Sequence, residues 1–307
     1  NAITKDAILS AIKSPRQIDT DLVEAYLARN SLDYLMGFNI SPVLWQRLRG
    51  AAKSAGRVQS PALRLVVDRE IEIEKFKSEE YWTISADFED ENDNKVQANL
   101  SLVDDEKVEK FSFRDSEKTI TTANALEQKE YQVTSVTSQK RNRNPYAPFT
   151  TSTLQQSASS NLKISPRDAM STAQKLYEAG LITYMRTDGI EMAPEGITSA
   201  RKQISDFLGK DFLPEKPRVF KNKAKNAQEA HECIRPTDFS QTPEKAKNLN
   251  KSELDLYTLI WRRALASQSR AAEVLQTTVL ISSLCDSTQF RLSGQVVTFE
   301  GHLKIFQ

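Results

Sequence analysis

The residues of this chain best suited to covalent chemistry are Tyr184 and Arg186, which lie two positions apart. A free phenol has a pKa of about 10, so it is a poor nucleophile at neutral pH unless a nearby positive charge favours the phenolate. A guanidinium two residues away can supply that charge or grip a phosphate with two hydrogen bonds. The pair is a candidate for attack on phosphorus, although a Tyr-x-Arg tripeptide alone is more often a packing or surface feature.

The preceding sequence predicts a helix that positions this pair. Ser165 suits an N-cap, Pro166 the first helical position, and Asp168 places a carboxylate in the first turn. Gly180 is well placed as the C-terminal stop. The apolar face consists of Ala169, Ala173, Leu176 and Tyr177. Tyr184 is therefore expected just beyond the end of a rigid element.

The period of the apolar residues changes three times along the chain. Residues 1–76 have helical patterns, including helices near 21–36 and from Ser60-Pro61 onward. Alternating residues from Trp82 onward predict strands, followed by a helix near 122–129 and a strand near 131–139. Helices are predicted at 151–160, 166–179, 195–208 and 252–267, and strands at 273–284 and 288–299. Ser252 and Asp255 are spaced as a capping pair at the start of the last of these helices.

This order predicts an α+β protein of several domains. We expect a helical domain at 1–76, a β-rich domain formed by 77–144 plus 271–307, and a helical domain inserted between them at 145–270. The two halves of the β-rich domain are expected to pair across the insertion. Domains of these sizes suit a chain of 307 residues, of which 39% are hydrophobic.

Composition excludes several classes of site and protein. Cys233 and Cys285 are isolated, and only His231 and His302 accompany them, so neither a disulfide framework nor a zinc site is expected. No apolar run reaches membrane length. No phosphate-binding Gly-x-x-x-x-Gly-Lys motif or Gly-x-Gly-x-x-Gly motif occurs, so a nucleotide ligand is not expected. These features favour the cytoplasm.

Charge is distributed unevenly, although the formal net charge is only +1. Residues 139–163 and 216–225 carry lysine and arginine without an acidic residue, whereas 87–109 is rich in aspartate and glutamate. This pattern suits a protein with one phosphate-facing surface. Each basic run could also be an ordinary solvated loop. When residues 216–225 are considered by themselves, the loop is the favoured interpretation.

Five ordered stretches carry a resemblance that covers almost the whole chain. The first is Leu-Tyr-Glu-Ala-Gly-Leu-Ile-Thr-Tyr-Met-Arg-Thr-Asp at 176–188, and the others are at 54–61, 148–156, 227–237 and 290–297. Together they resemble the bacterial type IA DNA topoisomerases. The resemblance implies a toroid whose helical domains are joined by a β-rich arch. It also implies an enzyme that relaxes negatively supercoiled DNA without ATP.

In that family Tyr184 would form a 5′-phosphotyrosine ester with single-stranded DNA, and Arg186 would orient the phosphate. His231 matches a histidine near the active site, where it would contact a phosphate or favour ionisation of the phenol. Arg235 matches a motif position that either contacts DNA or pairs with a carboxylate and braces the segment. From the residues alone, a lone histidine is more often structural.

The resemblance also assigns DNA contacts near the N-terminus. Arg57 and Gln59 would bind a backbone phosphate beside a helix start. Arg29, Asp33 and Phe38 would line a single-strand groove near a base pocket, and Arg29 and Asp33 are spaced to pair with each other.

The sequence departs from the family at several positions. Asn30 and Tyr34 stand where arginine is frequent, and Phe38 stands where tyrosine is common, which puts base preference at the cut site in doubt. Gly189 replaces a usual serine, and Ala2 replaces a usual glutamate.

The family's acidic metal-binding domain would lie before Asn1, and its C-terminal DNA-binding modules after Gln307. The chain therefore resembles an excised core, expected to bind single-stranded DNA weakly and not to relax supercoils alone. Mg²⁺ would belong to the missing domain, with no metal site in this chain. Two other functions fit the residues: a noncatalytic single-stranded-DNA-binding toroid module, or a tyrosine recombinase. The implied location is the bacterial cytoplasm, in association with the nucleoid.

Overall fold

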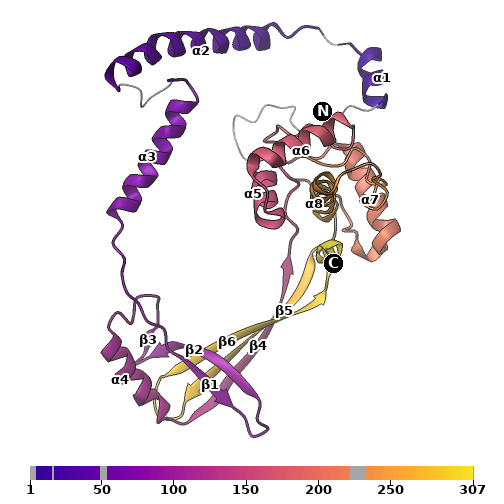
Figure 1. Cartoon of the computed structure of the whole chain (residues 1–307). Helices are drawn as coiled ribbons and strands as arrows, with labels where there is room; N and C mark the ends of the chain where they lie inside the picture. Colours follow the sequence, from indigo (N-terminus) through magenta and orange to yellow (C-terminus); the bar gives the residue numbers. More distant parts are fainter. Residues whose placement is uncertain (1–4, 16, 49–53, 222–231, 307) are drawn as a thin grey trace. The chain divides into compact units, whose positions relative to one another are not determined.

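The computed structural model describes residues 5–15, 17–48, 54–221 and 232–306 (Figure 1). Its backbone contacts divide the chain into two compact units. One consists of residues 1–13, 83–109 and 122–307, and the other of 14–82 and 110–121. Helix α1 (Lys5–Lys13) belongs to the first unit, and α4 (Ser116–Glu127) contains residues of both.

The unit of residues 14–82 and 110–121 is built around two long helices, α2 (Thr20–Arg47) and α3 (Gln59–Lys75). Asp19 caps α2 by accepting a hydrogen bond from the Leu22 amide at 3.0 Å. The predicted end of this helix near residue 36 is wrong, since α2 continues through Gly37 and Pro42. Pro42 removes one backbone donor, but the loss of one hydrogen bond does not end the helix.

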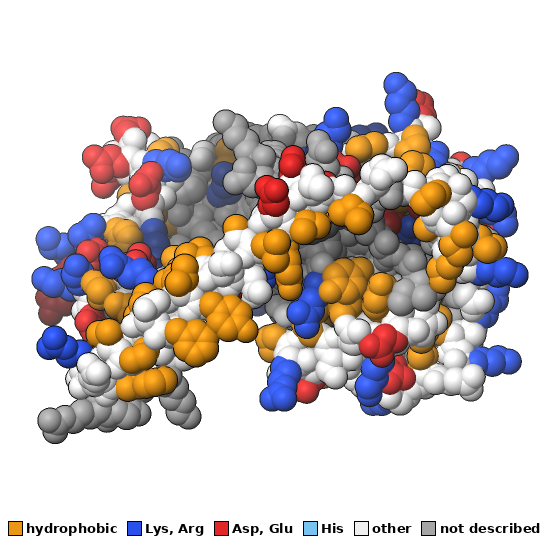
Figure 2. Space-filling model, turned by 90° about the horizontal axis from the view of Figure 1, so that it is seen from above, with side chains coloured by type: hydrophobic (Ala, Val, Ile, Leu, Met, Phe, Trp, Pro, Cys, Tyr) orange, Lys and Arg blue, Asp and Glu red, His pale blue; other side chains and the backbone are white. Residues whose placement is uncertain are grey.

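Both helices expose many large apolar side chains. In α2 these include Tyr26, Leu35, Phe38 and Trp45, each more than half exposed, and α3 exposes Leu63 and Leu65 similarly. Hydrophobic side chains are visible along the length of this helix in Figure 2.

The other unit contains a six-stranded sheet, order β1-β2-β6-β5-β4 with β3 beside β2, in which all pairs are antiparallel. The strands are β1 (Ser85–Glu89), β2 (Lys95–Val103), β3 (Glu106–Lys107), β4 (Tyr131–Arg143), β5 (Ala272–Ser283) and β6 (Gln289–Phe299). Strand β1 begins later than the alternation predicted, because the Trp82 amide donates to the Phe113 carbonyl oxygen at 2.8 Å outside the sheet.

Strands from before and after residues 144–271 are neighbours in this sheet. Strand β4 pairs with β5 from Tyr131 opposite Ser283 to Arg143 opposite Ala272, and β2 pairs with β6. The residues between β4 and β5 therefore leave and rejoin the sheet at adjacent positions. The exact limits of the three predicted domains remain predictions.

The segment between β4 and β5 folds into a helical cluster at one end of these strands (Figure 1). It contains α5 (Thr151–Leu162), α6 (Pro166–Glu178), α7 (Pro194–Leu208), η1 (Lys210–Phe212) and α8 (Lys251–Ser267), and η2 (Gly301–Phe306) joins it after β6. The core surrounds α8, whose Leu256, Tyr257 and Ile260 are fully buried.

The caps of these helices follow from local hydrogen bonds. Ser165 is the predicted N-cap of α6, and its Oγ accepts a hydrogen bond from the Asp168 amide at 3.1 Å. The capping pair predicted at Ser252 is wrong. Asn250 caps α8 instead, because its Oδ1 accepts from the Glu253 amide at 3.0 Å and Glu253 accepts from the Asn250 amide at 3.2 Å. Among the described helices, none has the length and apolar character needed to cross a membrane.

Candidate active site

Tyr184 lies just beyond the end of α6, as the sequence predicts. The helix stops at Gly180, which has a φ of +72°. The Gly180 amide donates to the Tyr177 carbonyl oxygen at 2.8 Å, and the Leu181 amide donates to that of Leu176 at 2.9 Å. This is the Schellman arrangement, in which the left-handed residue is normally glycine. It turns the chain sharply into the segment that carries Tyr184.

Buried and exposed side chains alternate along residues 183–187. Thr183, Met185 and Thr187 are buried, whereas Tyr184 is 40% exposed and Arg186 is also exposed. The phenol and the guanidinium therefore face outward together, separated by one buried methionine. Burial of Tyr184 among aliphatic side chains would have excluded chemistry at this residue. The exposure of Tyr184 is consistent with chemistry there.

Two threonines fix the backbone on either side of this pair. The Thr183 Oγ1 donates to the Cys233 carbonyl oxygen at 2.7 Å, which ties the segment to a neighbouring strand-like stretch. Thr151 Oγ1 donates to the Met185 carbonyl oxygen at 2.8 Å and accepts from the Thr187 amide at 2.9 Å. These bonds hold residues 183–187 in one conformation, so little ordering remains when a substrate binds.

The surroundings of the pair are aromatic and cationic. The Tyr184 ring lies edge-on to Tyr177, with ring centroids 5.2 Å apart. Arg186 lines a cavity of about 470 Å³ together with Arg167 and Lys175. The full lining is Arg167, Met170, Ser171, Gln174, Lys175, Met185 and Arg186. Three cationic side chains around one hollow suit an anionic ligand such as a phosphodiester.

Arg235 is placed inside the protein rather than on this surface. Its side chain is 4% exposed, and its Nε donates to the carboxylate of Glu232, whose side chain is 9% exposed. A second hydrogen bond joins Arg235 to the Pro236 carbonyl oxygen at 2.9 Å, and Glu195 lies 3.6 Å from Nη2. This geometry supports the bracing alternative. His231 lies outside the described residues.

Thr150 and its neighbours show how hydroxyl groups are used at the start of α5. Thr150 Oγ1 accepts a hydrogen bond from the Thr153 amide at 3.3 Å, and Thr153 Oγ1 accepts from the Thr150 amide at 2.9 Å. This reciprocal cap, together with the Thr151 bonds to residues 185 and 187, accounts for the cluster of hydroxyls without a phosphate.

A second cluster of predicted residues lies in the unit that contains α2. Arg57 holds Asp33 with two hydrogen bonds, Nε to Oδ1 at 2.9 Å and Nη2 to Oδ2 at 3.2 Å. The ion pair expected between Arg29 and Asp33 is replaced by this longer-range pair. The Arg57 guanidinium lowers the pKa of Asp33, with a smaller contribution from Arg29, and Asp33 in turn raises the pKa of Arg57.

Phe38 belongs to an open apolar cavity beside this ion pair. The cavity has a volume of about 610 Å³, and Tyr34 stacks on Phe38 within it at a centroid distance of 5.6 Å. Its lining is Asn30, Asp33, Tyr34, Gly37, Phe38, Ser41, Pro42, Trp45, Ser54 and Ala55. Sequence reasoning missed Trp45, because the helix was expected to end before it.

Arg29 and Gln59 are close in sequence to residues that line this cavity, but neither of them lines it. Arg29 is exposed on α2, and Gln59 is the first residue of α3. The clusters around Tyr184 and Asp33 lie in different compact units. Within the described parts of the chain, no three histidine, cysteine or carboxylate side chains are grouped in a way that could hold a metal ion.

Comparison with known proteins identifies relatives along the whole chain. A family model described as DNA topoisomerase matches residues 17–307. The DNA topoisomerase 1 of Zymomonas mobilis is 49% identical over 307 residues, and the alignment covers all of this chain and 25% of that protein. The DNA topoisomerase 1 of Rickettsia prowazekii is 43% identical over 318 residues, covering all of this chain and 41% of that protein.

Among solved structures, full-length topoisomerase I from Thermotoga maritima matches with a TM-score of 0.82 and 34% sequence identity. That match covers the whole of this chain and 49% of the Thermotoga protein. The chain thus spans less than half the length of each of these relatives.

Proposed function

The chain belongs to the DNA topoisomerase family, and from this premise we propose that Tyr184 is the nucleophile of a type IA enzyme that cuts one DNA strand, lets another strand pass and reseals the break. The fold supports a topoisomerase I core, since the match to the Thermotoga structure extends over all 307 residues. The observation that carries the proposal is the placement of Tyr184, which is exposed and follows a rigid helix end beside an exposed arginine.

The reaction at this site is a phosphoryl transfer. The Tyr184 phenolic oxygen attacks the phosphorus of a phosphodiester, and a bond from this oxygen to phosphorus forms while the bond to the 3′-oxygen of the preceding nucleotide breaks. The phenol loses its proton, and the departing 3′-oxygen gains one. The resulting 5′-phosphotyrosine ester keeps the bond energy, so that attack by the 3′-hydroxyl reverses the step without ATP.

Arg186 is proposed to bind the phosphate at the point where charge develops. A guanidinium can donate two parallel hydrogen bonds to phosphate oxygens, which both orients the group and stabilises its charge. Lysine is a poor substitute at this position because it lacks the planar pair of donors. Arg167 and Lys175, which line the same cavity, would attract the flanking backbone.

We propose that the α2 cavity receives a base of the strand upstream of the cut. Tyr34, Phe38 and Trp45 offer aromatic faces on which a base can stack. Arg57 and Gln59, beside the start of α3, would bind the adjoining phosphate, and Arg29 would add positive charge on the same helix. His231 is proposed to contact the scissile phosphate. Arg235 is proposed to brace the active segment through Glu232.

The remaining partners follow from the family. The substrate is proposed to be negatively supercoiled DNA, in the bacterial cytoplasm and in association with the nucleoid. Mg²⁺ is proposed to bind an acidic domain outside this chain, and no step above is assigned to it. We expect the 307-residue chain alone to bind single-stranded DNA without relaxing supercoils, and relaxation by the purified chain would contradict this expectation.

A cleavage assay on the longer protein that contains this chain tests the proposal. Tyr184→Phe is expected to abolish the covalent protein–DNA adduct while binding of a single-stranded oligonucleotide is retained. Tyr177→Phe is the matched control, because it removes a hydroxyl from the ring that contacts Tyr184 and is expected to keep the adduct.

Labelling each end of the oligonucleotide distinguishes the rival functions. Protein attached to a 5′ end supports the proposal, whereas attachment to a 3′ end indicates a tyrosine recombinase. An adduct that persists in Tyr184→Phe would show that another residue is the nucleophile. Binding with no adduct in the unmodified protein would favour a noncatalytic single-strand-binding module.

A further inference from the structure

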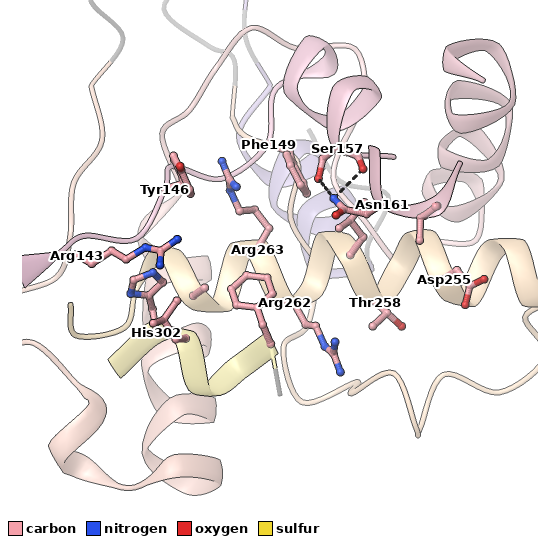
Figure 3. Close-up of a pocket in the computed structure, with 15 residues that line it drawn as sticks. Arg143, Tyr146, Phe149, Ser157, Asn161, Asp255, Thr258, Arg262, Arg263 and His302 are labelled. Atoms are coloured by element: carbon pink, nitrogen blue, oxygen red, sulfur yellow. Dashed lines mark hydrogen bonds between the residues drawn. The ribbon is translucent and has the colours of Figure 1, made fainter. Parts of the chain in front are cut away.

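A second cavity in the helical cluster shares no lining residue with the cavity beside Arg186. It has a volume of about 520 Å³, and its lining comes from the end of β4, the connection between β4 and α5, helices α5 and α8, and η2 (Figure 3). A volume of this size lies within the range of small-molecule binding sites, roughly 300 to 1,000 Å³. The family resemblance assigns no role to it.

The charge of this cavity is predominantly positive. Arg143, Arg262 and Arg263 line it, against a single acidic residue, Asp255. Among the described residues, neither Arg143 nor Arg262 has a carboxylate within ion-pair distance. Figure 3 shows Arg143 and Asp255 at opposite ends of the lining, so positive charge gathers at the β4 end.

An exposed aromatic ring stands beside this positive end. Tyr146 is 70% exposed, and the Arg263 guanidinium lies over its ring at 4.7 Å from the centroid. Arg263 is itself fixed, because its Nε donates to the Ala147 carbonyl oxygen at 2.6 Å and its guanidinium also lies over Phe149 at 4.9 Å. Arg263 therefore covers one face of the Tyr146 ring, and the exposed remainder of the ring is available for stacking.

A buried histidine at the same end has an unused polar atom. His302 is 5% exposed, and its Nδ1 is buried without a hydrogen-bond partner among the described residues. Figure 3 shows its ring close to Arg143. Leaving a buried polar atom unpaired costs free energy unless a ligand or water completes it.

The backbone holds His302 firmly in this position. Gly301 has a φ of +49°, and a Cβ there would lie 2.4 Å from the Ala271 carbonyl oxygen. The His302 amide donates to the Arg270 carbonyl oxygen at 2.9 Å. Burial, followed by the positive charges of Arg143 and Arg218, lowers the pKa of His302 to about 4, so the ring is neutral at pH 7.

We propose that this cavity binds one nucleotide of a single-stranded DNA segment, with its base stacked on Tyr146 and its phosphate held by Arg143 and the His302 imidazole. An aromatic face beside a guanidinium is the combination by which proteins hold single strands without reading their sequence. A neutral imidazole can donate one N–H to a phosphate oxygen, which would satisfy the unpaired Nδ1. That the nucleotide belongs to a DNA strand rests on the proposed function; the nucleotide chemistry rests on the cavity alone.

The affinity of the complete 307-residue chain for a fluorescent ten-residue oligodeoxythymidylate tests this site. Arg143→Gln is expected to weaken binding about tenfold, since a charged hydrogen bond is worth roughly that factor. Arg141→Gln is the matched control, because Arg141 is an exposed arginine two residues earlier on β4 and is absent from the lining. Tyr146→Leu is expected to weaken binding by about the same factor through lost stacking.

Photo-crosslinking locates the nucleotide independently of affinity. An oligonucleotide carrying 5-iododeoxyuridine is expected to attach to the peptide that contains Tyr146, and thymidine monophosphate in excess is expected to suppress that attachment. Attachment of the oligonucleotide only to peptides of α2 overturns the inference. Attachment at Tyr146 to the same extent in Arg143→Gln as in the unmodified chain also overturns it. If 5-iododeoxyuridine monophosphate attaches at Tyr146 while the iodinated oligonucleotide does not, the assignment to a strand is overturned.

The two proposals can fail separately in this experiment. If all variants bind the oligonucleotide as tightly as the unmodified chain does, the cavity site fails and the topoisomerase proposal stands. If the unmodified chain does not bind the oligonucleotide at all, the strand assignment and the proposed DNA contacts of this chain both fail. Circular dichroism of each variant confirms that the fold is retained.

Discussion

Replacing Arg235 with glutamine separates a bracing role from a DNA contact. In the unmodified chain Arg235 donates to buried Glu232 and to the Pro236 carbonyl oxygen. The substitution removes the positive charge and leaves the Glu232 carboxylate with the Ala193 amide, which donates to it at 2.9 Å. Removing one partner of a buried ion pair costs about 3 to 5 kcal/mol. Because one donor to Glu232 remains, we expect a loss near the lower end, about 3 kcal/mol.

The free energy of unfolding is best measured by urea titration of the complete chain. Trp261 reports on the right region, since it is buried in the same core and its Nε1 donates to the Phe239 carbonyl oxygen at 3.1 Å. Glu195→Gln is the control for the exposed arm of the network, because the Glu195 side chain is 75% exposed and lies 3.6 Å from Arg235. We expect that control to change stability by less than about 0.5 kcal/mol.

A double variant provides the sharper test. Glu232→Gln combined with Arg235→Gln removes both buried charges, so the double variant is expected to be more stable than Arg235→Gln alone. The reasoning is refuted if Arg235→Gln loses less than about 1 kcal/mol of stability while affinity for single-stranded DNA falls about tenfold. That result would assign Arg235 to DNA.

Three further predictions concern stability. Gly196→Ala is expected to destabilise the chain by about 1 to 3 kcal/mol in urea unfolding. The new Cβ would lie 2.6 Å from the Nε of Arg235, and Glu232 holds that side chain in place. An unchanged unfolding midpoint would show that Arg235 moves freely. Asn250→Ala is expected to lower stability by about 1 kcal/mol through loss of the α8 cap, and a helix content and melting temperature equal to those of the parent would contradict it. For His302, the folded pKa of about 4 lies below the ordinary value of 6.5, so the unfolded chain binds the extra proton between these pH values. Stability is therefore expected to fall by about 1.4 kcal/mol per pH unit as the pH drops from 6.5 towards 4, and His302→Gln is expected to show a shallower slope; identical slopes would refute the assignment.

The sequence was most informative where short-range hydrogen bonds decide the structure. Ser165 and Gly180 mark the two ends of α6 because a serine cap and a left-handed glycine act within one helical turn. The same locality placed Tyr184 just past a helix end. The sequence pattern failed to predict the end of α2. This helix contains Pro42, a residue type that usually ends or kinks a helix.

Contacts between distant residues could not be foreseen in the same way. Arg57 reaches Asp33 across 24 positions, although Arg29 is the neighbour that helix geometry favours. Thr151 ties Met185 and Thr187 across more than 30 positions, and no local sequence pattern indicates these contacts. The cavity around Tyr146 and His302 is built from residues that lie 156 positions apart (302 − 146), so no spacing rule in the sequence indicates it.

The route of the backbone into the helical cluster has a mechanical consequence. The chain enters after Arg143 on β4, leaves at Ala272 on β5, and returns after Phe299 on β6 to contribute η2. Three hydrogen-bonded strands therefore support the cluster side by side, as a ribbon rather than a single tether. Such a ribbon flexes readily across its face and resists bending within its plane. We therefore expect any displacement of Tyr184 relative to the far end of the sheet to occur mainly by bending of this ribbon across its face.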